Sequence, residues 1–116
     1  MKKFVSKMLA GALSVSMLCG VAAAEGETYV SWYTFGDVYL SSVRTALDAA
    51  MEAKGLKVVD KDSNANQQTQ TDDINTALVT GANAIVINLV ESGAIGTAEN
   101  LMNAVSAQNL PVVFFN

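Results

Sequence analysis

The feature that most constrains this chain is an unbroken apolar run at residues 84–87, the core of a strand expected at 84–89, with helical patterns before and after it. Ile85, Val86 and Ile87 follow one another there without a polar interruption. Such a run is typical of a parallel strand that helices cover on both faces. Parallel neighbours need crossover connections, which are usually helices, so we expect an α/β sheet with this strand inside it.

The rest of the chain beyond residue 24 alternates between strand patterns and helical patterns. Strands rich in β-branched and aromatic residues are expected at 28–34, 56–60, 84–89 and 112–115. Helices with apolar residues at three- and four-residue spacing are expected at 38–54, about 69–80 and 95–108. The residues predicted to face inward are Leu40, Val43, Leu47 and Met51, then Ile74, Ala77 and Leu78, then Ile95, Ala98, Leu101 or Met102, and Val105.

Single helices between successive strands predict right-handed crossovers and a three-layer α/β fold, a parallel sheet with helices on both faces. We expect the strand order 2-1-3-4, which reverses direction between the first and third strands. Ligands of such sheets bind at this switch point, beyond the carboxyl ends of the two strands. The fold alone therefore selects two loops as a candidate site, residues 34–39 and 88–93.

The first 24 residues have the layout of a secretory signal peptide. Three lysines precede an uncharged apolar run at 8–21, and Ala22, Ala23 and Ala24 offer a cleavage site. An uncleaved anchor and a lipoprotein acylated at Cys19 are the alternatives, although bulky Leu18 fits lipoprotein processing poorly. We predict cleavage after Ala24 and a periplasmic or extracellular location for residues 25–116.

Charge and composition beyond the signal segment exclude several classes of function. Four Lys/Arg face eleven Asp/Glu, a formal net charge of −7, which argues against nucleic acid and anionic membranes as partners. Without histidine, and with the single cysteine in the signal segment, neither a disulfide nor a zinc site is expected. Nucleophilic catalysis would lack its usual base. A glycosidase pair of Asp37 and Glu91 is the weakest alternative, so we do not expect an enzyme.

The two selected loops carry side chains that suit a sugar. Asp37 can accept hydroxyl protons in charge-assisted hydrogen bonds, and the flat ring of Tyr39 can cover an apolar sugar face. Asn88 has both a donor and an acceptor. Each also has a structural interpretation: Asp37 as a helix N-cap, Tyr39 as a core residue and Asn88 as a partner of turn backbone.

Several segments resemble one family, the periplasmic galactose/glucose-binding proteins. They are residues 33–44 (YTFGDVYLSSVR), Asp62-Ser63-Asn64, residues 87–91 (INLVE) and residues 109–116 (NLPVVFFN). The resemblance implies a type I periplasmic-binding-protein fold. It also implies that residues 25–116 form the N-terminal lobe, with the second lobe outside this sequence.

By position, the resemblance assigns the family's sugar-bonding aspartate to Asp37, its stacking aromatic to Tyr39 and its hydroxyl-bonding asparagine to Asn88. Two departures stand out. Tyr39 replaces the family's usual phenylalanine, and Gly36 replaces a second acidic or polar residue. Both leave the preferred sugar open.

The function that this resemblance implies is capture of a monosaccharide, galactose or glucose, by a monomeric binding protein. The protein would deliver it to the permease of an ABC importer and could also signal to a chemoreceptor. No cofactor is expected here, and the family's calcium site would lie in the second lobe. The alternatives are a binding protein for ribose, xylose or another small ligand, and the sensing lobe of a membrane receptor. One lobe alone is expected to bind sugar weakly or not measurably.

Overall fold

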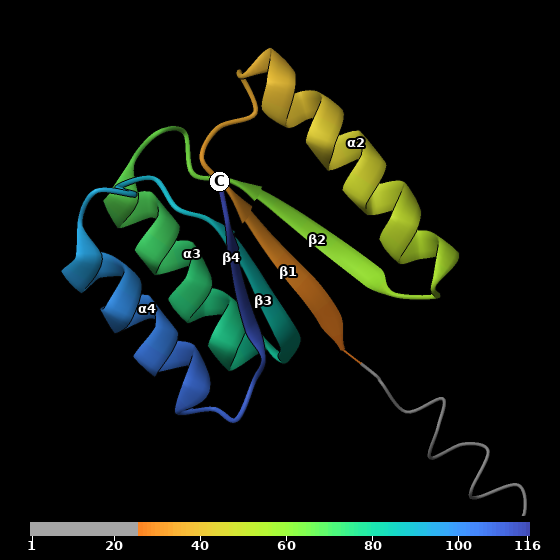
Figure 1. The fold of residues 1–116 in the computed structure, drawn as a ribbon. Helices are drawn as coiled ribbons and strands as arrows, with labels where there is room; N and C mark the ends of the chain where they lie inside the picture. The colour runs from red at the N-terminus through yellow and green to blue at the C-terminus, as the bar shows by residue number, and fades with distance from the viewer. Residues whose placement is uncertain (1–25) are drawn as a thin grey trace, which may run out of the picture.

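The computed structural model describes residues 26–116, which alternate strictly between strand and helix (Figure 1). The elements are β1 (Glu27–Trp32), α2 (Val38–Ala53), β2 (Lys57–Asp62), α3 (Gln67–Thr80), β3 (Ala82–Asn88), α4 (Ile95–Ser106) and β4 (Val112–Phe115). The predicted signal peptide at residues 1–24 lies outside the described residues. No helix within residues 26–116 has the length and apolar character that crossing a membrane requires.

The four strands form one parallel sheet in the order β2-β1-β3-β4, which confirms the predicted fold class and strand order. Helix α2 lies on one face of the sheet, and α3 and α4 lie on the other (Figure 1). Strand β1 pairs with both β2 and β3, so the order reverses beside it. The carboxyl ends of β1 and β3 therefore meet at the switch point, where ligands of such sheets bind.

The hydrophobic core lies between the sheet and the pair α3 and α4. Alternate residues of β1 and β3 point to this face and meet the apolar stripes of the two helices. Its buried members are Tyr29, Ile74, Ala77, Ile85, Ile87, Leu101 and Val105.

The opposite face, under α2, is covered less completely. The four positions of α2 predicted to face inward are all half-buried, and none is fully buried. Trp32 at the end of β1 is fully buried on this side. Its ring meets the edge of Phe115 with centroids 5.2 Å apart, and its Nε1 donates to Asp60 Oδ1 over 2.6 Å. An aromatic pair and an indole hydrogen bond thus supplement α2 in covering this face.

Several predicted boundaries were wrong by one or two residues. Strand β1 ends at Trp32 rather than at residue 34, and β3 spans Ala82–Asn88 rather than 84–89. Strand β2 continues to Asp62 through a stretch predicted as a connection, because pairing with β1 continues to Trp32. Helix α3 begins at Gln67, two residues early, since Asn66 Oδ1 accepts from Thr69 N over 2.9 Å and caps it.

The third predicted helix differs from α4 in two respects. Helix α4 ends at Ser106 instead of 108. Ile95, predicted to face inward, is 74% exposed, whereas Leu101 and Val105 are buried as predicted and Met102 is exposed. Ile95 is the first residue of α4 and follows a loop that is itself exposed at residues 91–93.

Candidate functional site

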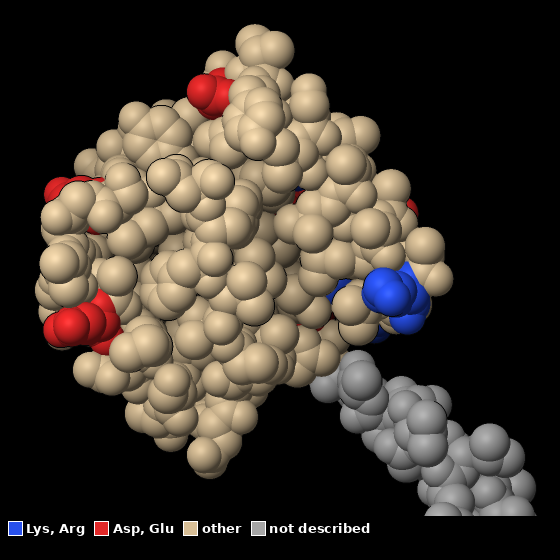
Figure 2. All heavy atoms as spheres, viewed as in Figure 1, with Lys and Arg blue, Asp and Glu red and all other residues tan. Residues whose placement is uncertain are grey.

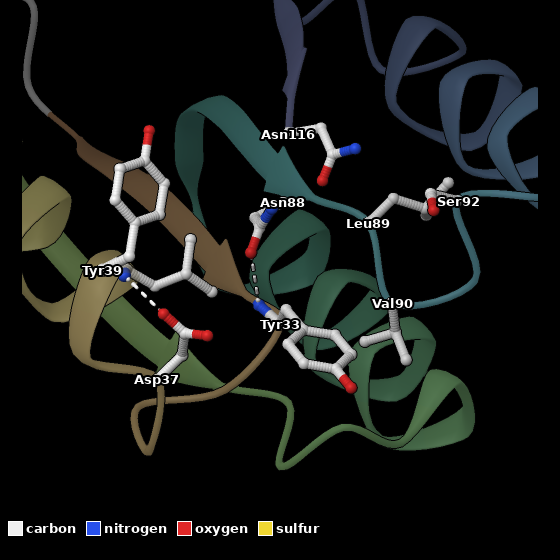
Figure 3. A pocket seen from close by; sticks show the side chains of 9 residues that line it. Tyr33, Asp37, Tyr39, Asn88, Leu89, Val90, Ser92 and Asn116 are labelled. Carbon is white, nitrogen blue, oxygen red and sulfur yellow. Dashed lines mark hydrogen bonds between the residues drawn. The ribbon is translucent and has the colours of Figure 1, made fainter.

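A cavity of about 400 Å³ lies at the switch point, between the loops that follow β1 and β3 (Figure 3). Its position agrees with the prediction made from strand order, and all three predicted site residues line it. The full lining is Tyr33, Asp37, Tyr39, Leu40, Asn88, Leu89, Val90, Ser92 and Asn116.

Asp37 serves as the N-cap of α2. Its Oδ1 accepts from the backbone N–H of Leu40 over 2.8 Å, and the residue is exposed. The helix begins here because aspartate in an extended conformation offers an acceptor to otherwise unpaired amides of the first turn. The cap uses one of the two carboxylate oxygens. The other can accept a hydrogen bond from a ligand, so the capping and binding interpretations of Asp37 are compatible.

Tyr39 does not enter the core. Its side chain is 70% exposed and stands at the edge of the cavity, on the same helical turn as Asp37 (Figure 3). Because an exposed aromatic ring beside a carboxylate can cover an apolar face of a ligand, its position suits the predicted stacking role.

Asn88 lies at the floor of the cavity and is 2% exposed. Its Oδ1 accepts from Tyr33 N over 3.0 Å, and its Nδ2 donates to the carbonyl of Phe115 over 3.3 Å. The side chain therefore joins the ends of β1 and β4 across β3. This geometry gives Asn88 a structural task, since both of its polar atoms already bond backbone groups.

Sequence reasoning missed Asn116, Ser92 and Tyr33 as lining residues. Asn116 is exposed, follows the apolar strand β4, and presents its side-chain amide at the cavity (Figure 3). The signal that selected Asn88, an amide directly after an apolar strand, could also have found Asn116. Tyr33 comes directly after β1, is half-buried and lines the cavity.

Comparison with known proteins places this architecture in a family. Residues 28–116 match the periplasmic binding protein domain. The chain belongs to the periplasmic binding protein family.

Two curated relatives of this periplasmic binding protein chain are named for the sugars they bind. The D-galactose/methyl-galactoside binding periplasmic protein of Haemophilus influenzae is 32% identical over 99% of this chain and 34% of its own length. The ribose import binding protein of Bacillus subtilis is 30% identical over 69% of this chain and 25% of its own length. The chain thus spans about a third or less of the length of these relatives.

Two solved structures share the fold of the periplasmic binding protein chain. One is the periplasmic binding protein component of the arabinose ABC transporter from Shewanella sp. ANA-3, bound to α- and β-L-arabinofuranose. It superposes with a TM-score of 0.68 at 18% identity, over 76% of this chain and 28% of its own. The other is an ABC transporter solute binding protein from Mycobacterium smegmatis with bound glycerol. Its TM-score is 0.68 at 23% identity, over 76% of this chain and 30% of its own.

The cavity lining of this periplasmic binding protein chain carries a single charged side chain. Asp37 is the one carboxylate among the residues that line the cavity, and no lysine or arginine joins it. On the face shown in Figure 2, acidic groups are scattered over a mainly uncharged surface of the described residues. Residues 26–116 hold no group of three or more His, Cys, Asp or Glu arranged to bind a metal.

Proposed function

We propose that this chain is the sugar-binding lobe of an extracytoplasmic solute-binding protein that captures a monosaccharide for an ABC importer. The observation that carries the proposal is the meeting of Asp37 and Tyr39 at a cavity on the switch point of the sheet. Membership in the periplasmic binding protein family and two curated relatives named for sugars support it.

The proposed contacts follow from the chemistry of a sugar ring, which has hydroxyls around its edge and C–H patches on its faces. The second carboxylate oxygen of Asp37 accepts from a hydroxyl, and Tyr39 covers a C–H face. Asn88 supports the cavity floor and keeps the ends of β1 and β4 in place. The exposed amide of Asn116 can donate to and accept from a further hydroxyl.

A volume of about 400 Å³ is near the low end of ordinary ligand sites, which suits one sugar ring. We further propose that the site binds without catalysis, because Asp37 is the one carboxylate of the cavity lining and no histidine, cysteine or lysine joins it there.

Galactose or glucose is the narrower proposal, and the galactoside-binding relative from Haemophilus influenzae supports it. Ribose is the alternative that the relative from Bacillus subtilis raises. One lobe leaves much of a sugar in water, so we expect dissociation constants on the order of millimolar for this chain.

Backbone amide NMR titration of the purified chain with galactose, glucose, ribose and arabinose tests the proposal. We expect saturable shifts at residues 34–40 and 88–92, largest for galactose or glucose. Asp37→Asn keeps an N-cap side chain but removes the charge, and Tyr39→Ala removes the ring, so both should weaken the response. Asp72→Asn, on the exposed side of α3, should not. No saturable shift with any of the four sugars would defeat the proposal.

A further inference from the structure

Gln70 of α3 is fully buried, with 0% of its surface exposed. Glutamine is mostly an exposed residue, and a buried amide is costly unless all of its polar atoms are paired. Gln70 lies in a stretch of polar residues that begins α3. Its burial therefore needs a reason that the helix itself does not supply.

Every hydrogen bond of the Gln70 side chain reaches a group far away in the sequence. Its Nε2 donates to Ser31 Oγ and to the carbonyl of Asn88, each over 2.9 Å. Its Oε1 accepts from the backbone N–H of Val90 over 3.0 Å. One side chain thus connects the end of β1, the end of β3 and the loop that follows β3.

A second glutamine of α3 holds the next amide of the same loop. Gln67, three residues earlier and on the same face of the helix, accepts from Glu91 N through its Oε1 over 3.0 Å. Two consecutive loop amides are therefore fixed by the first turn of α3. This loop supplies Leu89, Val90 and Ser92 to the cavity wall, although α3 contributes no lining residue itself.

The end of β3 is held from both faces of the sheet. On the α2 side, the Asn88 side chain bonds Tyr33 N and the carbonyl of Phe115. On the α3 side, Gln70 bonds the Asn88 carbonyl and Ser31, whose Oγ lies 3.2 Å from Ser63 Oγ. We propose that Gln70 is the positioning residue of the ligand site: it sets the cavity wall at residues 88–90 relative to β1. The identity of the ligand rests on the proposed function, but the position of the wall does not.

Replacing Gln70 by methionine keeps the length of the side chain and removes its amide. The Asn88 carbonyl, the Val90 N–H and the Ser31 hydroxyl then lose a buried partner, and such groups are expensive to leave unpaired. The loop is expected to move until water can reach these groups. The wall would no longer stand at a fixed distance from Asp37 and Tyr39.

Amide hydrogen exchange and sugar titration by NMR, on the same samples, test the proposal. In Gln70→Met we expect the amide of Val90 to exchange at least tenfold faster than in the wild type, while the amides of Ile85 and Ile87 in β3 stay protected. Sugar binding should be about tenfold weaker. In Gln67→Met, faster exchange is expected at Glu91, with a smaller loss of binding. Gln68→Met is the matched control, because Gln68 is exposed and bonds only Asp72 of its own helix.

A second control separates positioning from loss of stability. Ile74→Val removes one methylene from the core beside Gln70 and should lower stability without changing exchange at Val90 or sugar binding. The proposal is overturned if Gln70→Met exchanges and binds like the wild type, or if Ile74→Val loses binding equally. A wild-type chain without any sugar response, but with exchange at Val90 that depends on Gln70, would refute the proposed function. It would leave Gln70 as the residue that holds the wall.

Discussion

Two aspartates face each other between α2 and β2, and the sharpest stability prediction concerns them. Asp48 of α2 lies close to Asp60 of β2, whose Oδ1 also accepts from Trp32 Nε1. The Oδ1 of Asp48 is buried and accepts no hydrogen bond from the described residues. Burial raises the pKa of Asp48, and the neighbouring Asp60 and Glu52 raise it further, while Arg44 opposes them.

The raised pKa determines how stability depends on pH. The folded protein holds the Asp48 proton more tightly than the unfolded chain does. The contribution of the Asp48 carboxyl to the free energy of unfolding is therefore fully present below the ordinary aspartate pKa of about 3.9. It is lost as the pH rises through the raised pKa of Asp48. Above that pH two like charges face each other.

The size of the effect follows from the exposure of the pair. Like charges about 4 Å apart repel by about 1 kcal/mol in water and by more where water is excluded. Asp48 keeps partial contact with solvent and Arg44 offsets some of the repulsion, so we take the lower figure. Asp48→Asn should therefore raise the free energy of unfolding by about 1 kcal/mol near neutral pH, or roughly 4–8 °C in Tm for a domain of this size.

Urea unfolding followed by the fluorescence of Trp32, the single tryptophan of the chain, measures this difference from about pH 4 to about pH 8. We expect the advantage of Asp48→Asn to shrink toward zero at the acidic end. Glu99→Gln, at an exposed position of α4, controls for the loss of one negative charge from an acidic protein. The reasoning is refuted if Asp48→Asn is no more stable than wild type at neutral pH, or if its advantage is the same at both ends of the range.

Three further predictions concern the core and the two helix ends. Ile74→Ala empties a fully buried position and should lower the free energy of unfolding by about 2–5 kcal/mol in urea, and a loss below about 1 kcal/mol would contradict the assigned core. Asp37→Ala removes the N-cap of α2 and should lower the free energy of unfolding by about 1 kcal/mol, measured by thermal unfolding, whereas Asp37→Asn should lower it little. Equal losses of stability in the two variants would show that the cap is unimportant. Gly81→Ala places a side chain at φ +96°, in the left-handed region that ends α3, and should cost about 1 kcal/mol; an unchanged Tm would mean that the helix end is not held in this conformation.

Much of the fold could be predicted from local patterns. The apolar run in β3 showed that this strand is covered on both faces, and the spacing of Ile74, Ala77, Leu101 and Val105 identified the helix faces that form the core. Strand–helix alternation then limited the topology to a parallel sheet with right-handed crossovers. The expected strand order places the switch point between the loops that follow β1 and β3, and Asp37 and Tyr39 line the cavity found there. From their residue types alone, the helix-cap and core interpretations of these two residues stayed open.

The roles of the polar side chains could not be predicted in the same way. From the sequence, Asn88 could bond either a ligand hydroxyl or the backbone of a turn. The structure shows both of its polar side-chain atoms bonded to backbone groups at the ends of β1 and β4. Gln70 stands among polar residues at the start of α3, yet it is buried, and Ile95 was predicted to face inward, yet it is exposed.

The physical reason lies in the range of the interactions. Hydrophobic periodicity is a local property, so the sequence by itself determined which face of each strand and helix is apolar, and hence that helices and sheet form layers. Buried polar groups must be paired, but the partners of Gln70 lie 18 to 39 residues away, on strands that only the sheet brings together. Which amides support the cavity wall, and which remain available to a ligand, was therefore decided by the tertiary structure.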